Sequence, residues 1–104
     1  MINRIEKINE LLIRAPHDNF LKHALALEYI KIGNDKEARK LFEDILAYDE
    51  NFLGSYYQFA KLLERNDDTA LALRYYEKGM EIAKQASENR AFNELKTAYE
   101  ELIF

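Results

Sequence analysis

The chain has 104 residues, and its 15 basic and 19 acidic side chains give it a net charge of −4. It has no cysteine, which excludes disulfides, thiolate metal sites and a cysteine nucleophile. Without a basic excess, nucleic acid and an anionic membrane surface are unfavourable partners. Only three glycines and one proline interrupt the sequence, so we expect a single all-α domain with a modest core.

Apolar residues at helical spacing, separated by turn-forming residues, predict six helices. Pro16 ends the first helix, because proline cannot donate the next helical hydrogen bond. Asp18 or Asn19 is expected to cap the second helix, and Gly33 closes it, where a left-handed residue is usually required. The expected ranges are residues 2–14, 19–32, 35–48, 52–65, 69–85 and 88–103.

Polar caps mark the beginnings of the later helices. Asn34 and Glu37 stand three residues apart, as in a capping box, and Asp68 and Ser87 are expected to cap the fifth and sixth helices. The connections are short, so neighbouring helices are expected to pack antiparallel. The apolar stripe of the first helix comprises Ile2, Ile5, Ile8, Leu11 and Leu12.

Two stretches of the sequence repeat each other at an offset of 34 residues, as from Ala38 to Ala72. Each has, in order, a large, a small and a large residue, a turn former, a small residue and an aromatic residue. A unit of this length cannot bury its own apolar face, so the pattern predicts a solenoid of stacked units that offers a binding surface. The matched residues are Leu25, Ala26, Tyr29, Gly33, Ala38 and Phe42, and then Phe59, Ala60, Leu63, Asp67, Ala72 and Tyr76.

The repeated pattern resembles that of the tetratricopeptide repeat (TPR) family, in which each repeat is an antiparallel pair of helices, A and B. The resemblance implies an all-α, right-handed superhelix of antiparallel helix pairs, with about six helices in one domain over residues 1–104. Asp67 replaces the turn glycine of the second repeat, which aspartate tolerates better than most residues. The implied parts are a helix-B-like cap at 1–16, repeats at 19–52 and 53–86, and a capping helix at 87–104.

The two terminal helices depart from the family pattern. Arg4 stands at the offset of Ala38 and Ala72, where a small residue lets helices A and B approach closely. In the last helix, polar residues replace apolar ones, as a terminal cap requires. These polar residues are Asn93, Glu94 and Thr97.

The sequence contains no recognisable catalytic or metal-binding pattern. His17 and His23 are six residues apart, which does not place them on one helical face as ligands at i and i+4 would be. Ser55 and Ser87 lie in no nucleophile motif, and the isolated glycines cannot form a phosphate-binding loop. We therefore expect no enzymatic activity, no metal and no cofactor.

The sequence also carries no targeting or membrane signal. Its first residues have charges spaced among them and lack the apolar core of a secretory signal. No stretch approaches the roughly 20 apolar residues of a membrane span. We expect a cytoplasmic protein that does not enter the membrane.

TPR domains act as scaffold and adaptor modules that bind a peptide or a partner helix in the concave groove formed by successive A helices. The resemblance therefore implies that this groove is the functional surface here. Tyr57 is the strongest contact candidate, because Tyr56 and Phe59 already serve the core and exposed aromatic residues are common interface anchors. The candidate groove residues are Phe20, His23, Leu27, Lys31, Tyr57, Lys61, Glu64 and Leu95.

One partner class of the family is not expected here. TPR domains that clamp the C-terminal carboxylate of chaperones need Asn and Lys or Arg along the groove. His23, Leu27 and Gln58 occupy matching places in this sequence, so an acidic chaperone tail is not the expected partner.

Two alternatives remain open. Phe20 and Leu27 would instead pack on the first helix, and Leu95 would pack on helix 69–85. The apolar segment 102–104 would fold onto the last helix, or it would dock in the groove of a second copy. The second arrangement would make the protein a homodimer and a structural, self-assembling module.

Overall fold

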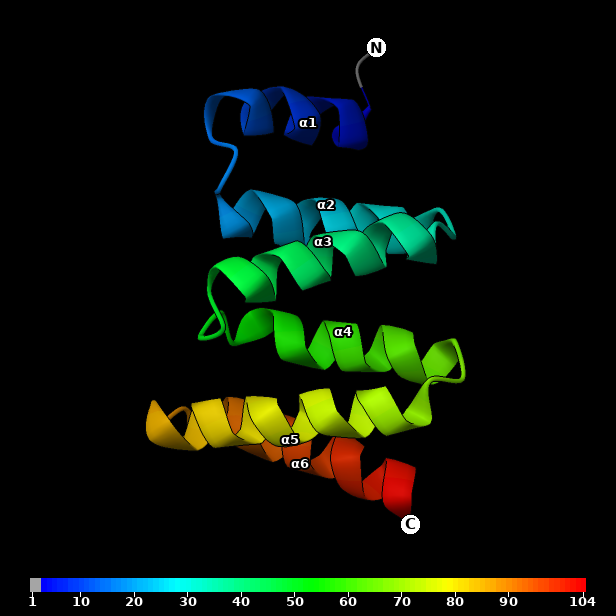
Figure 1. The fold of residues 1–104 in the computed structure, drawn as a ribbon, viewed down its shortest axis with the longest axis vertical. Coiled ribbons are helices and arrows are strands. Elements are labelled where there is room, and N and C mark those ends of the chain that lie inside the picture. Colours follow the sequence, from blue (N-terminus) through cyan, green and yellow to red (C-terminus); the bar gives the residue numbers. More distant parts are fainter. Residues whose placement is uncertain (1–2) are drawn as a thin grey trace. The chain divides into compact units, whose positions relative to one another are not determined.

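The computed structural model describes residues 3–104, which form six α-helices and no strand (Figure 1). The expected helices are confirmed, with ends that differ from the expected ones by two residues or fewer. Ile2, which we assigned to the stripe of the first helix, lies outside the described residues. The helices are α1 (Arg4–Arg14), α2 (Asn19–Lys31), α3 (Asp35–Tyr48), α4 (Gly54–Arg65), α5 (Thr69–Gln85) and α6 (Asn89–Ile103).

The chain divides into two compact units, Met1–Phe52 and Leu53–Phe104. In the first unit, α2 packs against both α1 and α3. The alanines that the repeat pattern places between α2 and α3, Ala26 and Ala38, are completely buried. The other buried apolar side chains of this unit are Ile8, Leu25, Phe42 and Ile45.

The helix α1 buries less of its stripe than expected. Ile8 is buried, whereas Leu11 is 43% exposed and the neighbouring Ile13 is 82% exposed. Arg4, which stands at the offset of Ala38, points its guanidinium at the carboxylate of Glu28 on α2. Because Glu28 is nearly buried, this pair ties α1 to α2 at a position where the repeats use a small residue.

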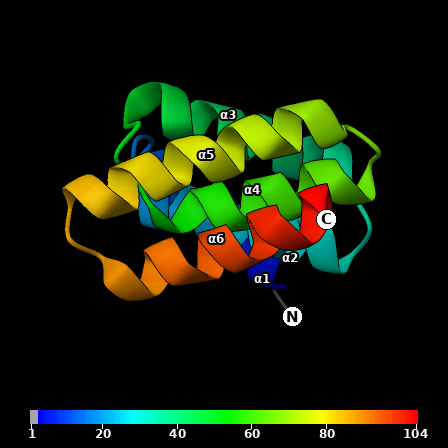
Figure 2. The same cartoon turned by 90° about the horizontal axis from the view of Figure 1, so that it is seen from below.

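In the second unit, α5 lies alongside both α4 and α6 (Figure 2). Gly79 on α5 makes this close packing feasible. A Cβ atom at this position would lie 2.8 Å from Cβ of Tyr56 on α4 and 3.1 Å from Cδ1 of Leu95 on α6. The buried apolar side chains of the unit are Tyr56, Phe59, Ala60, Leu62, Leu63, Ala72, Tyr76, Ile82, Ala83, Leu95 and Ala98.

Three helices end in the same left-handed turn. Gly33, Asp67 and Ser87 have φ angles of 79°, 63° and 58°. In each turn, the amide of the next residue donates to the carbonyl five residues before it, as from Asn34 to Tyr29. This bond is that of a Schellman motif, which satisfies carbonyl groups left unpaired at the end of a helix. Asp67 therefore replaces the glycine as predicted.

The helix beginnings follow the expected caps only in part. Asp18 caps α2, since its carboxylate accepts from the amide of Leu21 at 3.1 Å, and Asn34 caps α3 in the same way. The prediction for Ser87 was wrong, because Ser87 is the left-handed residue after α5 and Glu88 holds the N-cap of α6. Asp68 holds the N-cap of α5, but within residues 3–104 its carboxylate does not bond to the first amides of that helix.

None of the helices that residues 3–104 form is both long enough and apolar enough to cross a membrane.

Candidate functional site

Equivalent positions of the two units carry an aromatic pair with the same geometry. In the first unit, the rings of His23 on α2 and Phe42 on α3 are 5.9 Å apart at an interplanar angle of 68°. In the second unit, the rings of Tyr57 on α4 and Tyr76 on α5 are 6.5 Å apart, also at 68°. Both pairs are related by the offset of 34 residues, so the fold presents His23 and Tyr57 at corresponding places.

The surface of the first unit at this position is largely apolar. Phe20 is 79% exposed and meets the ring of Phe52 edge-on at 5.1 Å, so its side chain is not buried against α1. Leu27 is half-buried. Lys31 is exposed, and its Nζ lies 3.3 Å from Oε2 of Glu28, so this cation is already paired.

His23 is itself partly buried between two rings. It faces Phe42 and also lies 6.2 Å from the ring of Phe52. Burial in these surroundings lowers its pKa below the ordinary value of 6.5, because the charged imidazolium loses hydration there. His23 therefore presents a neutral ring at neutral pH.

The surface of the second unit is polar. Lys61 Nζ lies 5.7 Å from the centre of the Tyr57 ring and 3.6 Å from Oε2 of Glu64. The buried Tyr76 donates its hydroxyl to the carboxylate of Glu64. Burial of the phenol, and then this bond and the nearby charge of Glu64, raise the pKa of Tyr76. The hydroxyl thus stays protonated and holds Glu64 in place.

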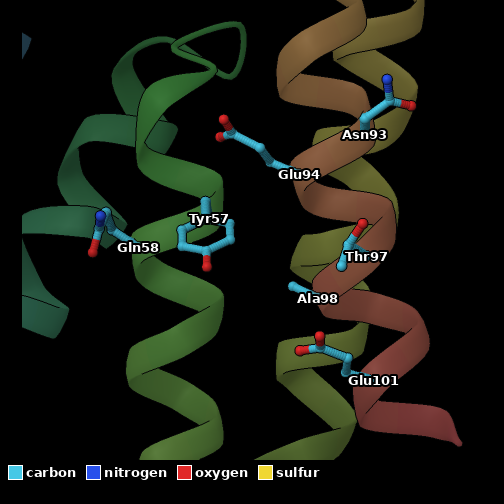
Figure 3. Close-up of a pocket in the computed structure, with 7 residues that line it drawn as sticks. All are labelled: Tyr57, Gln58, Asn93, Glu94, Thr97, Ala98 and Glu101. Atoms are coloured by element: carbon cyan, nitrogen blue, oxygen red, sulfur yellow. The ribbon is translucent and has the colours of Figure 1, made fainter.

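A pocket of about 540 Å³ opens between α4 and α6 beside Tyr57 (Figure 3). Tyr57 extends from α4, and Glu94 and Ala98 extend from α6 into the space between the helices. This arrangement offers one aromatic ring, hydrogen-bonding side chains and two carboxylates to a ligand. The lining residues are Tyr57, Gln58, Asn93, Glu94, Thr97, Ala98 and Glu101.

The structure places the candidate residue Leu95 in the core. Leu95 is only 2% exposed and lies close to Gly79 of α5. The adjacent face of α6 lines the pocket instead, through residues that sequence reasoning did not select. In the sequence these residues recur at positions i, i+3 and i+7, and this spacing places them on one helical face. These residues are Glu94, Thr97 and Glu101.

The histidines and serines do not assemble into a reactive site. The ring of His17 stacks on Tyr48 at 4.9 Å, whereas His23 faces other rings, and Ser55 is completely buried. Across residues 3–104 there is no group of three or more histidine and acidic residues that could hold a metal ion.

Comparison with solved structures identifies the class of protein. A tetratricopeptide repeat domain protein from Salinibacter ruber is similar to this chain in its solution structure, with 36% sequence identity and a TM-score of 0.80. The similarity covers 84% of this chain and 88% of the other. The crystal structure of the same domain gives 35% identity and a TM-score of 0.78, and covers 82% and 94% of the two chains.

The fold is also similar to that of the TPR2B domain of yeast Sti1, solved as a complex with pHsp70. That domain has a TM-score of 0.86 at 19% identity, and the similarity covers 94% of this chain and 78% of the other. No family model matches the sequence, and no curated protein does.

The chain belongs to the tetratricopeptide repeat family. The similarity to the Salinibacter domain confirms the resemblance drawn from the 34-residue pattern, and it confirms the expected all-α helical-repeat fold.

Proposed function

We propose that this protein is a non-enzymatic protein-interaction module of the cytoplasm, an adaptor or scaffold that binds a peptide or partner helix. The fold supports the proposal, since a domain of the same fold was solved with a protein-derived partner in yeast Sti1. The observation that carries it is the pocket of about 540 Å³ beside Tyr57. A half-buried tyrosine combines a rigid apolar ring with a polar end, which suits it to anchor a partner.

The chemistry of the pocket suits a polypeptide. Gln58 and Asn93 provide amide groups that both donate and accept, and Thr97 provides a hydroxyl. Such side chains can bond to the backbone of an extended segment, while the ring of Tyr57 contacts its apolar atoms. We propose that each unit has its own contact surface. In the first unit it comprises Phe20, His23, Leu27 and Lys31, and in the second unit Tyr57, Lys61 and Glu64.

We leave Leu95 out of the contact surface. Its burial at 2% exposure means that a partner could reach it only if α6 moved away from α5. On α6, Thr97 and Glu101 take the place of Leu95 as the contact residues.

A peptide-display selection tests the proposed function. A library of random 12-residue peptides would be selected on the wild-type protein and then screened against a Tyr57→Ala variant. We expect peptides that bind the wild type and lose at least tenfold in affinity with the variant, a typical effect of losing an aromatic anchor.

Two further variants make the selection decisive. Tyr48→Ala removes a largely exposed tyrosine outside the pocket and should leave binding unchanged. Thr97→Gln alters the pocket at an exposed residue without disturbing the core, and it should also weaken binding. Peptides that bind all four proteins equally would refute the groove assignment.

A structural, self-assembling role is the second candidate, and one observation favours it. Phe104 is 95% exposed and Ile103, the last residue of α6, is 43% exposed, so both apolar side chains remain accessible. A second copy could bury these side chains in its own partner surface, giving a homodimer.

A further inference from the structure

The partner-binding pocket of the second unit has an uneven distribution of charge. The carboxylates of Glu94 and Glu101 lie on its α6 wall, seven residues apart. Seven residues of α-helix correspond to two turns and about 10 Å along the axis. Across the pocket, α4 contributes no charged lining residue of its own, since Tyr57 and Gln58 are neutral.

Two cations near the pocket, Lys61 and Arg90, are already paired. Lys61 lies next to Glu64 and over the ring of Tyr57, so its charge is used within α4. Arg90 lies 3.3 Å from Glu94, but its side chain is 93% exposed, so this pair is weakened by water. Glu101 forms no ion pair within residues 3–104.

Glu101 also lies near the buried Tyr76, whose ring packs against the pocket residue Tyr57. Burial of the phenol and its hydrogen bond to Glu64 are the main causes that raise the pKa of Tyr76, and the charge of Glu101 adds to them. Glu101 and Glu64 therefore place two carboxylates near Tyr76, and Lys61 lies 3.6 Å from Glu64.

An aromatic ring beside carboxylates is a favourable environment for an organic cation. The ring attracts a cation through its quadrupole, and the carboxylates add charge-assisted hydrogen bonds. The protein itself uses this chemistry at the pocket edge, where the ammonium group of Lys61 lies 5.7 Å from the centre of the Tyr57 ring.

We propose that the pocket between α4 and α6 binds an arginine- or lysine-bearing segment of the partner, with the cationic group between Glu101 and the Tyr57 ring. This inference rests on the proposed function and specifies the partner's chemistry by charge complementarity. An acidic or phosphorylated segment would meet Glu94 and Glu101 at the same wall and would be repelled. Arginine suits the site best, since its planar guanidinium group can stack on the Tyr57 ring and at the same time donate hydrogen bonds to a carboxylate.

Fluorescence anisotropy with defined probes tests the inference. The probes are labelled eight-residue peptides of alanine and glycine that carry two arginines, two glutamines or two glutamates at the same positions. We expect saturable binding of the arginine probe alone. Its affinity should fall as sodium chloride rises from 50 to 300 mM, because partly exposed charges are screened.

A matched pair of variants tests whether the arginine probe binds at the pocket. Glu101→Gln removes the pocket charge, whereas Glu100→Gln removes the same charge one residue earlier, outside the lining. Both residues are exposed, so neither change should shift the unfolding temperature. We expect Glu101→Gln to weaken the arginine probe by about tenfold and Glu100→Gln to leave it within about twofold.

The outcomes separate this inference from the proposed function. Absence of arginine-probe binding, equal binding of the three probes, or equal effects of the two variants would overturn the inference. If peptides selected through Tyr57 prove acidic or neutral, the module binds peptides but its specificity is not cationic. If no selected peptide depends on Tyr57 or Thr97, the proposed function fails as well.

Discussion

The side chains at positions 23 and 57 show how a single repeat position is adapted to different surroundings. His23 meets Phe42 and Phe52, and burial of its ring lowers its pKa. Tyr57 meets the more polar Tyr76 and lies beside Lys61. The first unit therefore offers neutral, apolar contacts where the second offers hydrogen bonds and charge.

Protonation of His23 should destabilise the fold. Its folded-state pKa lies below the unfolded value of about 6.5, so the unfolded chain binds more protons as the pH falls through that value. Stability from this residue is thus fully present above pH 6.5 and is lost below it. Urea unfolding at pH 8 and pH 5.5 should show a smaller pH effect in His23→Gln than in wild type.

The other histidine provides the control for this measurement. His17→Gln removes an exposed imidazole that stacks on Tyr48, and comparison of the two variants isolates the contribution of His23. If the stability of His23→Gln depends on pH as strongly as that of the wild type, burial of His23 does not cause the pH dependence.

The hydroxyl of Tyr76 should contribute measurably to stability. It is completely buried and donates to the ionised carboxylate of Glu64, and hydrogen bonds to charged groups contribute about 1.5–3 kcal/mol. Tyr76→Phe should lower the free energy of unfolding by roughly that amount in urea denaturation. Phe42 at the equivalent place of the first unit shows that the ring alone packs there, so an unchanged stability would mean that the bond contributes nothing.

At the scale of the helices, the second unit depends on a close approach at Gly79. An alanine there would raise helix propensity by about 1 kcal/mol, but its methyl group would lie 2.8 Å from Cβ of Tyr56. Because Tyr56 and Leu95 are both buried, overpacking of about 1–3 kcal/mol should outweigh that gain. Thermal and urea unfolding of Gly79→Ala should therefore show a net loss of stability.

Gly54 provides the matched control for this helix contact. It is the first residue of α4, and a Cβ added there would meet nothing within 4 Å. Gly54→Ala should change stability by less than about 0.5 kcal/mol or increase it slightly. Equal effects of the two substitutions would show that α5 does not depend on the absence of a side chain at Gly79.

The helix ends illustrate which local signals are reliable. Pro16, Gly33 and the capping residue Asp18 were sufficient to predict where α1 and α2 end and begin. Ser87 was misassigned because a serine before a helix is a common cap, and only hydrogen bonding at the end of α5 reveals its left-handed conformation.

At the scale of the whole molecule, the two units share a repeat pattern but differ in exposed surface. The self-assembly candidate belongs to this scale, and sedimentation velocity tests it. The intact chain and a variant that lacks residues 102–104 would be compared across a concentration series. If Phe104 mediates association, only the intact chain should form a dimer, and a monomer in both cases would dismiss homodimerisation.

The candidate site was predictable only in part. Tyr57, Lys61 and Glu64 lie together on α4 as the repeat register suggested, with direct contacts between Lys61 and each of the other two. On α6 the expected Leu95 packs into the core, and the pocket is lined by Glu94 and Glu101 instead. The resemblance was weakest in this helix, so its register could not identify the face that lines the pocket.

The sequence alone determined the helices, their order and the spacing of the buried alanines, because capping, turn chemistry and hydrophobic periodicity are local properties of the chain. Only the tertiary structure decided which side of α6 is buried, and hence which charges surround Tyr57. The rotation of a helix about its axis depends on how its neighbours pack. Here that rotation follows from the gap at Gly79, which receives Leu95 and leaves Glu101 facing the pocket.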